Sequence, residues 1–240
     1  MLLPTRQTRA KLVKRYKRFL ADVQLDDGRI LTVHCPNSGS MLGCSDPGLP
    51  VLISRSTNPQ RKYPWTLELV RVGPSWIGIN TARTNKLVHE ALTNGRINHF
   101  DPIKTIVPEV KISEKSRLDF MLEHEPGGRT TYLEVKNCSL AQDKCALFPD
   151  AVTARGTRHL EELISLAHQG HGASLLFCIQ REDTDAFQPA AHIDPNYAET
   201  LAKAIKAGVL VLAFKARVSP QEIYIRKEVP VSLPPSPDLP

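Results

Sequence analysis

Residues 118–136 read LDFMLEHEPGGRTTYLEVK and place two carboxylates and an amine on what we expect to be neighbouring strands. Side chains alternate faces along a strand, so Glu134 and Lys136 point the same way. Asp119 lies in the preceding apolar run, and Gly127-Gly128 supplies the turn between the two runs. The segment therefore predicts a strand pair that brings Asp119 close to Glu134 and Lys136.

This trio of side chains points to a specific chemistry. Two carboxylates suit a hard divalent cation such as Mg²⁺ or Mn²⁺, which polarises a phosphate and activates water. The ammonium of Lys136 would neutralise charge that builds on a scissile phosphate, or orient the attacking water. The combination is typical of phosphodiester cleavage. Glu-apolar-Lys is also an ordinary ion-pair pattern on solvated sheet faces, so the order of the surrounding elements has to decide.

Composition describes a globular chain without a membrane segment. The 240 residues suffice for one large domain or two smaller ones, and 41% apolar and 23% charged residues are ordinary for such a chain. No stretch approaches the ~18 consecutive apolar residues of a membrane helix. Met1-Leu2-Leu3 runs into Pro4 and basic residues instead of a signal-peptide core. We therefore expect a cytoplasmic protein with no membrane partner, and the sequence leaves the oligomeric state unknown.

The cysteines lack the spacing of a metal or disulfide framework. Their number is odd and no C-x-x-C pair occurs, whereas zinc sites and disulfide sets show closer or even-numbered spacing. We expect reduced thiols that serve packing, in keeping with a reducing compartment. The five are Cys35, Cys44, Cys138, Cys145 and Cys178.

Positive charge is concentrated near the N-terminus. The net charge is +6, and seven basic side chains precede the first acidic residue, Asp22. Such a block is typical of a surface that binds a polyanion, although it also suits a merely solvated terminus. Within it, Arg15, Lys17 and Arg18 are candidate DNA contacts.

The first third of the chain alternates apolar and polar residues in short runs separated by turn signals, such as Asp26-Asp27-Gly28. Five short strands without a long helix predict a five-stranded OB-like β-barrel, a fold that often binds nucleic acid. Arg61 and Lys62 stand in a loop beside Tyr63 and Trp65 and are candidate phosphate contacts, while the alternation favours a core position for Trp65. The expected strands are 19–25, 30–35, 51–53, 65–69 and 76–79.

From Thr84 the pattern changes to alternating helices and strands. Apolar residues recur with helical spacing over 84–95 and again over 155–169. Residues 173–179 are almost entirely apolar, as in a strand buried on both faces. Asp194-Pro195 is a cap and first-turn pair for a third helix. The expected strands are 103–111, 116–122, 131–140, 173–179, 209–214 and 222–226.

These patterns divide the chain into three parts and make the fold class α/β in two domains. We expect an OB-like nucleic-acid-binding domain over 1–82. A second domain over 83–228 begins with the order helix, three strands, helix, strand, and is expected to form a mixed sheet. Five prolines from Pro230 onward predict an extended or disordered tail over 229–240.

The element order of the second domain, with Asp119 on its second strand and Glu134-Val135-Lys136 on its third, resembles the PD-(D/E)xK nuclease fold. Leu118 replaces the proline that gives this fold its name. Five sequence blocks look like the sugar fermentation stimulation protein family, over about residues 12–227. The resemblance implies an OB-like domain, a restriction-endonuclease-like αβββαβ core, DNA binding, and a link to regulation of sugar (maltose-type) metabolism genes. The blocks are 34–41, 58–62, 65–68, 78–81 and 148–153.

Carried onto this chain, the nuclease pattern assigns roles to individual residues. Asp119 and Glu134 become ligands of Mg²⁺ or Mn²⁺, and Lys136 becomes the catalytic cation. Many enzymes of the fold keep a glutamate on the first helix, which implies Glu90 as a further metal ligand; the alternative is an exposed helix charge. Related enzymes also place a polar group in the cleft after the buried strand, and Gln180 takes that position, where a polar residue is also ordinary.

The start of the second expected helix carries a further cationic group. Arg155, Arg158 and His159 lie where main-chain N–H groups and the helix dipole favour an anion. We expect Arg155 and Arg158 to contact DNA phosphates, and the alternative is a structural pairing with Asp150 or Glu162. His159 could act as a metal ligand, but its spacing does not demand that role.

Three functions remain open on the sequence. The first is a double-stranded DNA-binding protein, mainly sequence-nonspecific, whose nuclease-like domain serves chiefly to hold DNA. The second is an active Mg²⁺- or Mn²⁺-dependent DNA endonuclease. The third is an RNA-binding module that uses the barrel on single strands. No helix-turn-helix reader is evident in the sequence, so we expect contacts dominated by the nucleic-acid backbone.

Overall fold

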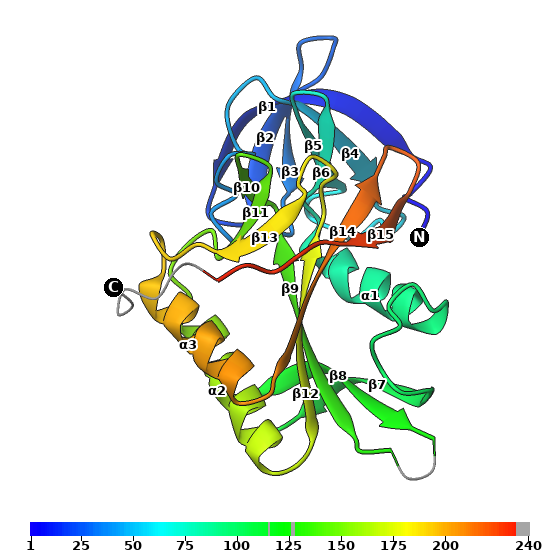
Figure 1. Cartoon of the computed structure of the whole chain (residues 1–240). Helices are drawn as coiled ribbons and strands as arrows, with labels where there is room; N and C mark the ends of the chain where they lie inside the picture. The colour runs from blue at the N-terminus through cyan, green and yellow to red at the C-terminus, as the bar shows by residue number, and fades with distance from the viewer. Residues whose placement is uncertain (115, 126–127, 234–240) are drawn as a thin grey trace.

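The chain forms a β-barrel followed by a larger mixed-sheet domain (Figure 1). The structure is a computed structural model and describes residues 1–114, 116–125 and 128–233. It confirms the expected two-domain α/β fold. Within this described part, no helix is long and apolar enough to cross a membrane. All five cysteines carry free thiols.

The N-terminal barrel is a six-stranded sheet in the order β3-β2-β1-β4-β5-β6. A parallel bridge between His34 of β3 and Thr66 of β5 closes the first five strands into a ring. Its interior holds fully buried side chains such as Val23, Val33 and Ile53. The strands are β1 (Gln7–Tyr16), β2 (Leu20–Gln24), β3 (Ile30–His34), β4 (Pro50–Arg55), β5 (Trp65–Val72) and β6 (Ser75–Gly78).

The basic N-terminal segment is itself a barrel strand, β1. Its many charged side chains mask the alternating pattern that would have predicted a strand. In β1, Ala10 and Leu12 are buried, while Arg9 and Lys11 are exposed. This period of two is that of a half-buried strand. The expected five-stranded barrel is therefore confirmed with β1 as a member, and β6 is the hairpin partner of β5 outside the ring.

A buried ion pair ties the barrel to the segment that leads into the second domain. The Glu68 carboxylate is 2% exposed and accepts two hydrogen bonds of 2.8 Å from the Arg83 guanidinium. Ser54 and Asn80 donate to the same carboxylate. Burial alone would raise the pKa of Glu68, but these donors outweigh it and the pKa is lowered. Arg83 belongs to the short 3₁₀ helix η1 (Thr81–Arg83).

The second domain is built on a six-stranded mixed sheet in the order β15-β14-β12-β9-β8-β7. Strands β9, β12 and β14 run parallel to one another, and the other neighbours pair antiparallel. The central strand β12 is buried over its whole length, as its apolar sequence predicts. The strands are β7 (Ile103–Lys111), β8 (Arg117–His124), β9 (Thr131–Cys138), β12 (Gly172–Ile179), β14 (Leu210–Val218) and β15 (Ile223–Glu228).

Helices cover both faces of this sheet (Figure 1). They are α1 (Thr84–Thr93), α2 (Ala154–His168) and α3 (Pro195–Lys206). Helix α1 packs on one face, in a cluster that includes Val135 of β9. Helices α2 and α3 pack on the other face, where Leu160 and Leu201 share a cluster with Phe177 of β12. Glu134 and Lys136 alternate with Val135 along β9, so they face α2.

A three-stranded sheet in the order β10-β11-β13 adds to the second domain. Its strands are β10 (Leu140–Gln142), β11 (Cys145–Phe148) and β13 (Ala186–Pro189), and at three or four residues they are too short to give a sequence pattern. The proline-rich segment begins beside β13, because Phe187 N–H donates to Pro230 O at 2.9 Å. The rest of that segment, 234–240, and Gly127 of the expected turn lie outside the described residues.

The two domains are held together by close contacts of main chain and side chain. Gly78 N–H, at the end of β6, donates to the carbonyl oxygen of Gln180 at 2.9 Å. A Cβ atom on Gly78 would lie 2.2 Å from Gln180 Oε1, so this approach requires glycine. At a second contact, Met41 N–H donates to Asp150 Oδ2 at 2.8 Å.

We expect Gly78→Ala to destabilise the protein by about 1–3 kcal/mol, because the added methyl overpacks the junction against Gln180. The double variant Gly78→Ala with Gln180→Ala should recover part of that loss, since the colliding side chain is gone. The measurement is urea unfolding of the four proteins of the cycle. Ser75→Ala in the same strand serves as the control. Additive losses in the double variant would contradict a collision with Gln180.

Candidate functional site

The site begins where β8 and β9 diverge. The two strands pair through Phe120–Leu133, Met121–Tyr132 and Leu122–Thr131. Just beyond the first pair, the main-chain pairing of β8 with β9 ends. Val135 N–H donates instead to Asp119 Oδ2 at 2.7 Å, so the side chain takes the place of a main-chain carbonyl. Asn85, in the first turn of α1, donates to Oδ1 at 2.7 Å. The carboxylate is therefore fixed between β9 and α1.

Glu134 and Lys136 form the second half of the site, together with His159 of α2. Lys136 Nζ lies 2.6 Å from Glu134 Oε1, and His159 Nδ1 makes a short contact with the same oxygen. Lys136 Nζ also lies 3.3 Å from His159 Nδ1. The Glu134 side chain is almost entirely buried, and its Oε2 has no hydrogen-bond partner among the described residues.

The pKa values of the two carboxyls show opposite electrostatic environments. Burial raises the pKa of Asp119 to about 6, and the charge of Glu134 adds to the increase against the effects of Val135 N–H, Asn85 and Lys136. Burial also acts to raise the pKa of Glu134, but Lys136 and His159 outweigh it, so that pKa lies below its ordinary value. We call this site between the diverging strands β8 and β9 the fork. It holds the ionised carboxylate of Glu134 close to that of Asp119, whose burial opposes ionisation.

These features fit a divalent cation. Glu134 has a buried oxygen without a partner in the described part of the chain, and the neighbouring Asp119 carboxyl has a raised pKa. A bound cation would pair with that oxygen and would stabilise the ionised form of Asp119. Among the described residues, no group of three or more His, Cys, Asp or Glu side chains is placed to hold a metal. A site with two carboxylates suits Mg²⁺, which usually binds one or two carboxylates and completes its shell with water and phosphate oxygens.

A groove of about 470 Å³ opens beside this cluster. His159 lines it together with Arg155 and Arg158 of α2, and Lys111 and Arg117 stand across from them on β7 and β8. Arg155 Nε lies 3.4 Å from His159 Nε2, which links the groove to the Glu134 carboxylate. The predicted cationic start of α2 therefore lies next to the predicted metal ligands. Glu109 and Glu114 also line the groove.

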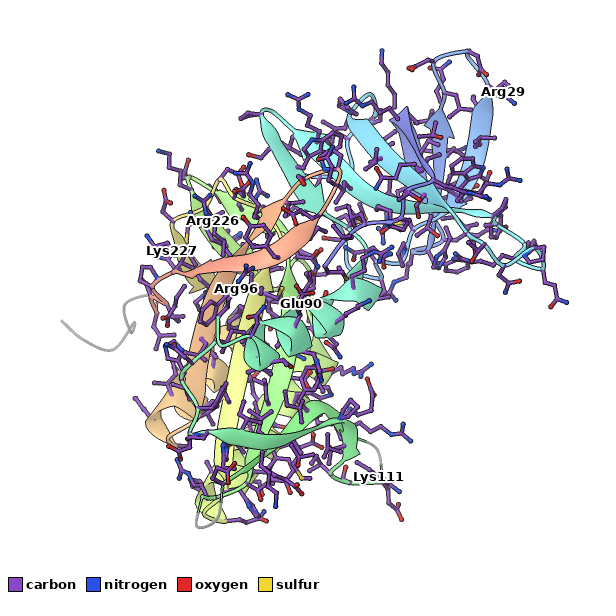
Figure 2. All side chains as sticks on the ribbon, turned by 90° about the vertical axis from the view of Figure 1, so that its right-hand side faces the viewer. Arg29, Glu90, Arg96, Lys111, Arg226 and Lys227 are labelled. Carbon is purple, nitrogen blue, oxygen red and sulfur yellow. The ribbon has the colours of Figure 1, made fainter. Side chains whose placement is uncertain are left out.

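The structure does not bring Glu90 to the site. Its Oε1 is 3.0 Å from the amino group of Met1, and the side chain is 41% exposed on the α1 side of the sheet (Figure 2). The role of a third metal ligand is therefore not carried by Glu90 in this conformation. Asn85, in the first turn of α1, is the residue of this helix that reaches Asp119. Glu90 lies more than one turn later and points to Met1 instead.

Gln180 is fully buried and does not line the groove beside His159, where a cleft position was expected. Its Nε2 donates to Thr84 Oγ1 at 3.1 Å and to Asn137 Oδ1. Thr84 begins α1 and Asn137 belongs to β9, so Gln180 joins α1 to the sheet. Its side-chain amide therefore holds α1 against β9, while its main-chain carbonyl accepts Gly78 N–H at the junction of the domains.

The candidate DNA contacts of the barrel fall into two groups. Arg15 donates to the carbonyl oxygens of Asn37, Gly39 and Arg18 at 2.6–2.7 Å, which commits its guanidinium to the barrel's own loops. Arg61 similarly binds Thr66 Oγ1 at 2.9 Å and His34 Nδ1 at 3.0 Å. The side chains of Lys17, Arg18 and Lys62 are exposed, and that of Arg18 also donates to Ser38 O at 3.2 Å. The barrel candidates thus lie on a different domain from Arg155 and Arg158.

Two residues of the site carry little signal in the sequence. Asn85 is a common helix-start residue, and nothing in its spacing predicts a bond to Asp119. His159 follows Arg155 by four residues on α2, which places both on one helix face, but only the packing of α2 on β9 brings His159 to Glu134.

Comparison with known proteins gives matches over both domains. The family described as the sugar fermentation stimulation protein RE domain matches residues 82–222, and the SfsA N-terminal OB domain matches residues 13–79. The sugar fermentation stimulation protein homolog of Desulfotalea psychrophila is 52% identical over 211 residues, which cover 88% of this chain and 89% of the relative. The homolog of Geobacter metallireducens is 48% identical over 97% of this chain and 100% of the relative.

A solved structure agrees with these matches. It is that of Pyrococcus furiosus SfsA in complex with Ca²⁺, which is 26% identical to this chain. The superposition has a TM-score of 0.87 and covers 97% of this chain and 98% of the other. The likeness therefore extends over the barrel and the mixed-sheet domain alike.

The raised pKa of Asp119 makes the stability of the metal-free protein depend on pH. Because the folded state holds this proton more tightly than the unfolded state, stability is lost as the pH rises from about 4 through about 6. Relative to Asp119→Asn, which stays neutral, the wild type should lose about 2–3 kcal/mol over this window. The measurement is urea unfolding of both proteins with chelator at a series of pH values. Asp26→Asn, in an exposed turn, should follow the wild type, whereas parallel curves for the wild type and Asp119→Asn would contradict the raised pKa.

Proposed function

This chain belongs to the sugar fermentation stimulation protein family, and we propose that it binds double-stranded DNA with a divalent cation held at Asp119 and Glu134. The observation that carries the proposal is the meeting of Asp119, Glu134 and Lys136 beside a groove lined by Arg155 and Arg158. The fork contributes oxygen ligands, and the groove contributes charge for a phosphodiester backbone.

The donor set supports Mg²⁺ or Mn²⁺ as the cation. Carboxylate oxygens are preferred ligands of hard cations, and the relative from Pyrococcus furiosus was solved in complex with Ca²⁺, a cation of the same kind. In this chain, Asp119 and Glu134 would hold the metal, with Oε2 of Glu134 the oxygen that has no other partner among the described residues. When bound, the metal would polarise a phosphate and lower the pKa of a water.

The remaining residues of the site have roles that follow from their contacts. Lys136 is held by Glu134, so its ammonium is positioned for a phosphate that enters beside this carboxylate. His159 contacts the Glu134 oxygen that Lys136 also uses, and this leaves Oε2 available. Arg155 and Arg158 would bind the flanking phosphates, helped by the N-terminus of α2.

Backbone contacts of this kind carry little sequence information. We therefore propose mainly sequence-nonspecific binding in the cytoplasm, with the link to sugar (maltose-type) metabolism genes resting on the family alone. The single-stranded RNA reading depends on the barrel, where Arg15 and Arg61 are committed to internal hydrogen bonds. The groove lined by Arg155 and Arg158, which we call the arginine groove, lies on the nuclease-like domain. Its position favours duplex DNA over single-stranded RNA as the ligand.

Hydrolysis of DNA is the second candidate function. The specific observation in its favour is that all three side chain types of the nuclease pattern converge, and that the fork keeps two mutually repelling carboxylates. Relief of this repulsion accounts for metal binding alone, so the feature that favours hydrolysis is the ammonium of Lys136 beside the two carboxylates, where it could stabilise charge on a reacting phosphate.

We expect the protein to nick supercoiled DNA in Mn²⁺ or Mg²⁺, and Asp119→Asn to lower the rate at least about 100-fold, because loss of a metal ligand exceeds the effect of losing its supporting contacts. The measurement is gel analysis of plasmid DNA, with chelator as the blank. Asp26→Asn is the matched control. Equal nicking by Asp119→Asn and the wild type would rule out hydrolysis at this site.

We also expect duplex affinity to fall steeply with salt, because each phosphate contact releases counterions and contributes about 0.9 to the slope of log affinity against log salt. Removing Arg155 and Arg158 together should reduce that slope by about 2. Arg29→Ala is the control, since Arg29 stands at the tip of the barrel, far from the mixed-sheet domain (Figure 2). An unchanged slope in the double variant, measured by fluorescence anisotropy, would place the DNA on another surface.

A further inference from the structure

A second cleft, of about 520 Å³, lies between the two domains. The barrel contributes the turn that carries Arg18 and the loop 37–40. The mixed-sheet domain contributes Ser139 and the loop 148–153. Neither the metal site nor the arginine groove accounts for this cleft, because their lining residues are different.

The walls of the interdomain cleft are fixed by hydrogen bonds that cross between loops and domains. Arg15 holds the loop 37–40 through three carbonyl oxygens at 2.6 to 3.4 Å. Ser40 Oγ donates to Asp150 O at 2.5 Å, which joins the barrel loop to the loop of the other domain. A Cβ atom on Gly39 would lie 2.8 Å from Asp150 Oδ2, so the two loops approach as closely as glycine permits. The cleft is therefore preformed.

The lining of the cleft combines apolar surfaces with polar edges. Leu147, Phe148 and Val152 provide apolar area, Ser38 provides a hydroxyl group, and Arg18 and Asp150 provide charged groups at the edge. A nucleobase has the same character, with flat faces that favour apolar contact and edges that form hydrogen bonds. Its volume is in the range of pockets for one small molecule, which admits a single nucleotide but not a duplex.

The cleft is also close to the metal site along two elements. Lys136 of β9 belongs to the site, and Ser139, the residue that follows β9, lines the cleft, a separation of roughly 10 Å at ~3.3 Å per residue. That distance corresponds to about three stacked nucleotides at ~3.4 Å each. On α2, the N-cap Thr153 lines the cleft, while Arg155 lines the groove. A DNA strand that crosses the start of α2 would therefore reach both the interdomain cleft and the metal site.

We infer that the interdomain cleft holds an unpaired base of a DNA strand whose backbone passes the Asp119–Glu134 site. The preferred ligand is then DNA with a junction between duplex and single strand, in which the duplex lies along the arginine groove. This inference rests on the proposed function and adds the substrate class.

The test is binding, measured by fluorescence anisotropy in Ca²⁺ with three labelled probes. The first is a short duplex, and the second is the same duplex with an unpaired arm of about ten nucleotides, within the site size of an OB-fold. The third carries abasic nucleotides at the base of the arm. The variant is Val152→Asp, which places a negative charge in the cleft at a position that is 76% exposed. Ile30→Asp is the matched control, because Ile30 is 60% exposed at the start of β3 and does not line the cleft.

We expect the wild type and Ile30→Asp to bind the armed duplex at least about fivefold more tightly than the plain duplex, and the abasic arm to lose that gain. Val152→Asp should bind all three probes alike. Equal affinity of the wild type for plain and armed duplex, or an unchanged preference in Val152→Asp, would overturn the inference while leaving the proposed function intact. Failure to bind any probe at low salt would overturn both.

Discussion

The hydrogen bond from Val135 N–H to Asp119 Oδ2 is the interaction on which the arrangement of the site depends. It satisfies a main-chain donor at the point where β8 leaves β9, so the strands can diverge without leaving that N–H unpaired. The divergence opens the sheet beside Glu134. Because the acceptor is a carboxylate, the same bond that makes the fork also fixes a metal ligand there. Asn85 holds the second oxygen from α1.

The fork carries an electrostatic cost that the surroundings only partly offset. Lys136 and His159 stabilise the charge on Glu134, whereas burial and the Glu134 charge oppose ionisation of Asp119. A buried hydroxyl on Tyr197 of α3 has no hydrogen-bond partner among the described residues, and burial raises its pKa, with the charge of Glu134 adding to the increase. The negative charge of Glu134 thus also acts on a buried group of α3. Such a balance is more useful to ligand binding than to folding stability.

Local patterns in the sequence predicted most of the second domain and the core of the site. The apolar run of β12, the capping pair Asp194-Pro195 and the alternation around Glu134 each specify their elements by short-range physics. Strand β1 was missed because Lys and Arg side chains occupy its exposed positions and conceal the buried Ala10 and Leu12. Contacts such as Asn85 with Asp119, or Gly78 with Gln180, depend on long-range packing that no local pattern records. Glu90 was assigned by analogy with a fold, and analogy does not fix which turn of α1 faces the fork.

We propose that the fork holds one divalent cation between Asp119 and Glu134. The most direct test is a crystal grown with Mn²⁺, in which anomalous scattering locates the metal independently of activity. We expect a single strong peak within bonding distance, about 2.0–2.2 Å, of oxygens from both carboxylates, with Oε2 of Glu134 among them. A peak elsewhere, or saturating Mn²⁺ with no peak at the fork, would contradict it.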